Sequence, residues 1–140
     1  MKDNYKIALS AIVDEFHFEV VVKPEGYEDV MIQTPEVNRP GLALAGFFGV
    51  FEPERIQLIG KAETQYLQSL EPSTKRVVLQ NFVDAKPVAI LYTTGLPVDE
   101  ALLERAQLRN VPVLRTQTKT SPILSSLIAS LNNQDRKSVV

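Results

Sequence analysis

Apolar residues recur at helical spacing in several stretches of the chain. In residues 5–16 they predict an amphipathic helix that ends near His17, with an apolar face of Ile7, Ala8, Ala11, Ile12 and Phe16. The same pattern predicts helices over 62–70, 74–85, 98–110 and 121–133. The apolar positions of the helix over 98–110 are Leu102, Leu103, Ala106 and Leu108. Ser121 is expected to cap the last helix, because Pro122 follows and suits a first helical turn.

Short runs rich in β-branched residues alternate with these helices. They predict strands within 18–23, 29–34, 54–60, 88–94 and 111–116. From residue 88 onward the order is strand, helix, strand, helix with short connections, which predicts parallel strands joined by a right-handed crossover. We therefore expect an α/β fold with a small mixed, largely parallel sheet and flanking helices. Residues 132–140 are polar without periodicity and are predicted to form a tail or the start of a linker.

Composition narrows the class of partner. The chain has 44% hydrophobic and 23% charged residues, as an ordinary folded domain has. Its formal net charge is -2, with acids and bases interspersed, so nucleic acid and anionic membranes are not expected partners. The chain contains no cysteine, which rules out disulfides and thiolate metal sites and suits the cytoplasm. Exposed valine and leucine on the helices suggest at most a weak homo-oligomer.

No residue set predicts catalysis. The stretch "IGKAE" places a glycine and Lys61 between a strand and a helix, but a phosphate loop needs an earlier glycine where Arg55 stands and a hydroxyl where Ala62 stands. His17 is the only histidine and has no second imidazole or thiolate with which to hold a metal. We therefore expect no catalytic residue, no metal and no cofactor in this chain.

Polar residues follow the predicted strands at their carboxyl ends. In open α/β sheets, ligands settle beyond those ends, where helix N-termini also point. The residues there form a candidate site for an anionic ligand or a nucleotide-sugar: Asn38, Arg39, Gly41, Thr93, Gly95, Arg115, Thr116 and Thr120. The alternative is that these residues only cap helices and turns.

The stretch "NRPGLALAGFF", residues 38–48, predicts a turn followed by a short helix. Gly41 is expected to permit tight backbone geometry, and the helix to pack Leu42, Leu44, Ala45 and Phe47 on the sheet. Arg39 needs a partner, which is either a carboxylate within the domain or an anionic ligand. We expect the internal carboxylate.

Several segments in order resemble the N-terminal domain of HPr kinase/phosphorylase, the bifunctional regulator of carbon catabolite repression in bacteria. They are "NRPGLALAGFF", "ERIQLIGKAE" with "YLQSL", a strand ending "TTGL", and "VPVLRTQTKTS". The resemblance spans about Val13 to Leu131, so residues 1–131 are predicted to form this domain. The family's N-terminal domain is similar in fold to the first domain of the Mur ligases, which holds a nucleotide-sugar and has a sandwich of sheet and helices.

In the family, ATP, Mg²⁺ and the docking of HPr belong to a C-terminal catalytic domain whose motifs do not occur in this sequence. The resemblance therefore implies a non-catalytic accessory domain with that catalytic domain and HPr as partners, and no catalytic residue is carried over. Either the chain is the N-terminal part of a longer enzyme or it is a stand-alone relative. We expect the first, because the polar tail ends where the interdomain connection would begin. The other function considered is a stand-alone binding module for a nucleotide-sugar or a phosphorylated metabolite.

Overall fold

A five-stranded sheet forms the centre of the structure, a computed structural model that describes residues 5–46 and 51–133. The strand order is β2-β7-β6-β5-β4. Four strands are parallel, namely β4 (Val37–Asn38), β5 (Ile56–Ile59), β6 (Ala89–Tyr92) and β7 (Val113–Arg115). At one edge β2 (Glu19–Val22) runs antiparallel to β7. The predicted largely parallel, mixed sheet is confirmed.

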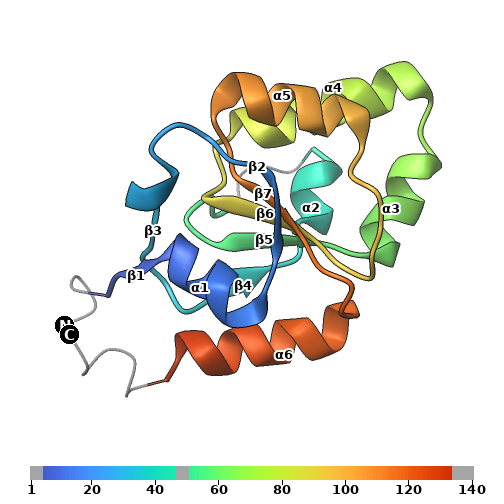
Figure 1. Cartoon of the computed structure of the whole chain (residues 1–140). Coiled ribbons are helices and arrows are strands. Elements are labelled where there is room, and N and C mark those ends of the chain that lie inside the picture. The colour runs from blue at the N-terminus through green and yellow to red at the C-terminus, as the bar shows by residue number, and fades with distance from the viewer. Residues whose placement is uncertain (1–4, 47–50, 134–140) are drawn as a thin grey trace.

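Helices cover both faces of this sheet (Figure 1). One face carries α2 (Gly41–Leu44), α3 (Lys61–Gln68), α4 (Pro72–Asp84) and α5 (Glu100–Arg109). The opposite face carries α1 (Leu9–Phe16) and α6 (Thr120–Leu131). Every residue of β5 and β6 is buried, as expected for parallel strands that are covered on both sides. The predicted α/β class with flanking helices is therefore confirmed, in three layers.

Alternate residues of the central strands contribute to two separate cores. Leu58 and Leu91 pack in the core on the side of α1 and α6. Ile59 and Tyr92 pack with Phe82 in the core under α3, α4 and α5. The period-two alternation of a strand thus assigns neighbouring residues to opposite helical layers.

The N-terminal helix is shorter than predicted. Residues 7 and 8 form a strand, β1 (Ile7–Ala8), that pairs antiparallel with β3 (Met31–Ile32) after a short 3₁₀ turn, η2 (Tyr27–Asp29). The backbone N–H of Leu9, the first residue of α1, donates to Val30 O at 3.0 Å. This long-range pairing overrides the local helical periodicity of residues 5–8. It also reduces the strand predicted over 29–34 to two residues.

Two predictions for the later helices were wrong in detail. The apolar face of α5 contains buried Leu102 and Ala106, but Leu108 is 69% exposed. At about 100° per residue, position 108 lies about 240° around the helix from position 102, away from the core. Ser121 is not the N-cap of α6, since the helix already begins at Thr120 and Lys119 occupies the cap position.

The segment after β4 turns into a short helix, as predicted, but other residues are buried. Ala43 and Leu44 are buried, whereas Ala45 is exposed. Gly41 is exposed, and a Cβ added to it would meet no atom within 4 Å. Its φ is not positive either, so the turn does not require glycine there. The predicted packing of Phe47 lies outside the described residues, and the side chain of Leu42 is likewise not described.

Candidate functional site

The carboxyl ends of the four parallel strands lie together at one end of the sheet, as the strand ends of parallel neighbours must. After β5 the chain enters α3 on one face, and after β7 it enters α6 on the opposite face, where α6 contacts β4 and β5. The starts of α3 and α6 therefore lie on either side of the ends of β4 and β5. A crevice between helices on opposite faces is the usual ligand position in open α/β sheets.

A pocket of about 340 Å³ lies between the starts of these two helices. Its lining consists of Arg39, Lys61, Ala62, Thr94, Lys119, Thr120, Ser121 and Pro122. Three of these residues are cationic and none is acidic. Arg39 and Thr120 belong to the predicted site, whereas the two lysines were not predicted. Lys61 occurs in "IGKAE", a stretch that does not match the phosphate-loop pattern, and for that reason it is not among the predicted site residues.

Arg39 binds a carboxylate of the domain itself. Its Nε and Nη2 atoms donate to the two carboxylate oxygens of Glu63 at 3.1 and 2.8 Å. Glu63 is only 6% exposed, and its Oε1 also accepts the backbone N–H of Gly60 at 2.9 Å. This pairing confirms the expected internal partner of Arg39 and fixes the end of β4 against the start of α3.

Hydroxyl groups join the start of α6 to the central strands. Thr93 Oγ1 lies 2.6 Å from Thr120 Oγ1 and 3.3 Å from Ile59 O. Thr93 is fully buried, so these contacts satisfy a hydroxyl group that water does not reach. Of the predicted residues, Thr93 therefore does not line the pocket, but its hydroxyl contacts Thr120, which does.

The backbone beside the pocket adopts an uncommon conformation. Thr94 has a φ of 61°, which is rare for a β-branched residue. Its N–H donates to Thr118 O at 2.8 Å, and the next N–H, that of Gly95, donates to Thr116 O at 2.9 Å. Two hydrogen bonds to the loop after β7 thus hold the loop after β6 in place.

The remaining predicted site residues lie outside the pocket and have structural contacts. Asn38 Nδ2 donates to Gln57 Oε1 at 2.9 Å. Arg115 donates to Leu96 O at 2.8 Å and to Gly95 O at 2.7 Å, so it stabilises the turn after β6. Gly41, Gly95 and Thr116 do not line the pocket either. For these residues the alternative, in which they stabilise turns and strand ends, agrees with the contacts.

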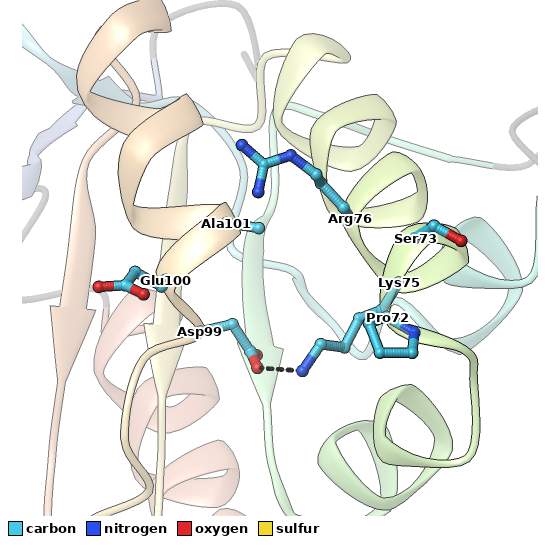
Figure 2. Close-up of a pocket in the computed structure, with 7 residues that line it drawn as sticks. All are labelled: Pro72, Ser73, Lys75, Arg76, Asp99, Glu100 and Ala101. Atoms are coloured by element: carbon cyan, nitrogen blue, oxygen red, sulfur yellow. Dashed lines mark hydrogen bonds and ion pairs between the residues drawn. The ribbon is translucent and has the colours of Figure 1, made fainter.

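A second pocket, of about 350 Å³, lies between the first turns of α4 and α5 (Figure 2). Its charged residues are balanced, because Lys75 and Arg76 are accompanied by Asp99 and Glu100. Lys75 Nζ and Asp99 Oδ1 point toward one another at 3.4 Å, as Figure 2 shows. This balance leaves no net charge to attract an ion.

Asp99 also accepts a hydrogen bond from a buried tyrosine. The hydroxyl of Tyr92 donates to Asp99 Oδ2 at 2.9 Å, and Tyr92 is fully buried. Burial, and secondarily the nearby charge of Asp99, raise the pKa of the Tyr92 hydroxyl well above its ordinary value. Tyr92 is therefore a neutral donor at physiological pH, and its contact anchors the start of α5 to β6.

Within residues 5–46 and 51–133, no group of three or more histidine or acidic side chains is placed to hold a metal ion. His17 ends α1 in a left-handed conformation with a φ of 57°. In the same part of the chain, no helix is both long and apolar enough to cross a bilayer.

Comparison with known proteins identifies the family. The model of the family described as HPr Serine kinase N terminus matches residues 7–131. HPr kinase/phosphorylase of Clostridium botulinum (strain Alaska E43 / Type E3) is 36% identical over 121 residues, which cover 86% of this chain and 39% of the relative. The Clostridium perfringens (strain SM101 / Type A) relative is 36% identical over 128 residues, or 91% of this chain and 41% of that protein. This chain thus spans about two fifths of the length of these relatives.

A solved structure supports the fold. It contains the CBS and DRTGG domains of the regulatory region of Clostridium perfringens pyrophosphatase, complexed with the activator diadenosine tetraphosphate. The TM-score is 0.61 at 18% identity, and the match covers 89% of this chain and 46% of that one. This likeness concerns the fold alone, and the expected likeness to the Mur ligases stays a prediction. The match of the family model over nearly the whole chain, with relatives of the same kind, places this protein in the HPr serine kinase N-terminal family.

Proposed function

We propose that this chain is a non-catalytic, regulatory N-terminal domain of an HPr(Ser) kinase/phosphorylase that acts in carbon catabolite repression. The observation that carries the proposal is the extent of the match: the N-terminal family model covers residues 7–131, and the relatives are about two and a half times as long as their matched parts. ATP and Mg²⁺ then bind to a catalytic domain outside this chain. That domain and HPr are the protein partners, and the cytoplasm is the location.

Two measurements test this function. The chain is incubated with HPr, ATP and Mg²⁺, beside a full-length relative as the positive control, and only the relative is expected to phosphorylate HPr. In the relative, deletion of the segment that matches residues 7–131 is expected to change the balance of kinase and phosphorylase activity. Phosphorylation of HPr by the isolated chain would contradict its non-catalytic character. An unchanged balance after the deletion would contradict the regulatory role.

A second candidate function is a binding module for an anionic ligand, either a nucleotide-sugar or a phosphorylated metabolite. The specific observation in its favour is the pocket whose described lining includes Arg39, Lys61 and Lys119 and no acidic residue. A thermal-shift screen with both ligand classes tests it, because a ligand that binds the folded chain alone raises its melting temperature. The absence of any shift at millimolar concentration would count against this candidate.

A further inference from the structure

The pocket between α3 and α6 has positive charge that no carboxylate in residues 5–46 and 51–133 neutralises. The carboxylate of Glu63 lies beside the pocket, but it already accepts hydrogen bonds from Arg39 and from the N–H of Gly60. Within the described part of the chain, neither Lys61 nor Lys119 forms an ion pair. Lys61 and Lys119 are both exposed and line the same pocket, and neither has a counter-charge among the described residues, in a protein whose net charge is -2.

Beside the pocket, the domain already binds one carboxylate of its own, that of Glu63. Glu63 is almost fully buried there, and it is held by a guanidinium group and a backbone N–H, which are the same kinds of donor that protein sites present to free anions. Arg39 uses Nε and Nη2 for this contact, and its side chain remains 38% exposed. The Arg39–Glu63 pair is thus neutral and fixed in place, and the two lysines are the other charged residues of the described lining.

The size and the walls of the pocket restrict the ligand further. Its volume of about 340 Å³ is at the lower end of the range for small-molecule sites, about 300–1,000 Å³. Among the described residues, its lining contains no aromatic side chain on which a nucleobase would stack, and the apolar residues there are Ala62 and Pro122. The hydroxyls of Thr94 and Ser121 add donors for oxygen atoms. These properties favour a compact oxyanion over a nucleotide-sugar.

We propose that this pocket binds a single phosphate group, as inorganic phosphate or as a small phosphate monoester, between Lys61 and Lys119. The proposal rests on the binding function given above as the second candidate, and it specifies the ligand class. A phosphate dianion matches the two unpaired ammonium groups in charge, and its oxygens accept from the donors around the cavity.

The test is a titration of the full chain, followed by the amide NMR signals at the starts of α3 and α6. Inorganic phosphate, glycerol 3-phosphate and UDP-glucose are added separately, with sodium chloride adjusted to keep the ionic strength constant. We expect the two phosphates to shift these signals in a saturable manner and UDP-glucose to bind no more tightly than inorganic phosphate. Lys61→Gln and Lys119→Gln are each expected to weaken phosphate binding about tenfold, the usual effect of losing one charge-assisted contact.

Lys23→Gln is the control for an exposed lysine away from the pocket: Lys23 pairs with Glu28 at 3.9 Å and follows the carboxyl end of β2, which is antiparallel to β7 and so ends at the other end of the sheet's strands. Unchanged phosphate binding in Lys61→Gln and Lys119→Gln, or an equal loss in Lys23→Gln, would overturn the proposed site. Tighter binding of UDP-glucose than of phosphate would overturn the ligand class and leave the binding function standing. If none of the three ligands binds, both proposals fail.

Discussion

Replacing Gly60 with alanine places a methyl group where the start of α6 already lies. Gly60 caps α3 with φ −115° and ψ −163°, an extended conformation that alanine also adopts, so the backbone requires no glycine. The added Cβ would lie under 3.0 Å from Thr120 Oγ1 and 3.3 Å from Arg39 Nη2. The Thr120 side chain must therefore move, and its 2.6 Å contact with Thr93 Oγ1 is lost.

The magnitude follows from three contributions. Forcing an extra methyl group into a packed site costs about 1–3 kcal/mol. Loss of the contact between the two threonine hydroxyls costs about 1 kcal/mol. Alanine has less conformational freedom than glycine in the unfolded chain, which offsets about 0.4–1 kcal/mol of this loss of stability. Gly60→Ala is therefore expected to lower the free energy of unfolding by about 2 kcal/mol.

Urea denaturation followed by circular dichroism measures this loss. Gly41→Ala is the control, because a Cβ at Gly41 meets no atom within 4 Å and the position opens α2; it is expected to be as stable as the parent or slightly more so. Thr120→Ala removes the clashing hydroxyl, so the double variant with Gly60→Ala should lose about 1 kcal/mol less than the sum of the single variants. Strict additivity, or a Gly60→Ala variant as stable as the control, would refute the steric explanation.

Two further predictions concern ionisable contacts. Tyr92→Phe removes the donor to Asp99 and should lower the unfolding free energy by about 1–2 kcal/mol. The pKa of Tyr92 is higher in the folded state than in the unfolded state, where it is about 10, so the parent should also lose stability as the pH rises above that value. This loss should be smaller in Tyr92→Phe. The same dependence of stability on alkaline pH in both proteins would contradict the raised pKa of Tyr92. Hydrogen bonds from Arg105 lower the pKa of Asp84 in the folded state. The contribution of Asp84 to the free energy of unfolding is therefore complete above about pH 3.9 and is lost as the pH falls further. Asp84→Asn should cost about 1 kcal/mol at neutral pH, and a cost that persists in acid would argue against this ion pair.

The fold class and much of the element order could be predicted from the sequence, because they depend on local periodicity. The strands β5 and β6 are short, apolar except for Gln57, and bounded by turn residues, and this pattern is typical of a parallel sheet covered on both faces. The need of Arg39 for an anionic partner was also predictable, since a guanidinium is always charged. These inferences need only the residue and its near neighbours along the chain.

The composition of the pocket could not be predicted in this way. Lys61 begins α3 and Lys119 occupies the N-cap of α6, on opposite faces of the sheet, and they line one pocket because the chain enters α6 on the face opposite α3 after β7. Likewise, β1 is a strand because β3 pairs with it, although residues 5–8 have helical periodicity.

The sequence alone therefore determined the α/β class, the parallel strands and the resemblance to a family. The tertiary structure decided which carboxylate neutralises Arg39, which of the strand-end residues stabilise turns, and which lysines of the pocket have no ion-pair partner in the described part of the chain. The physical reason is that periodicity and turn chemistry are local properties, whereas charge compensation and edge pairing depend on distances between residues that only the folded chain brings together.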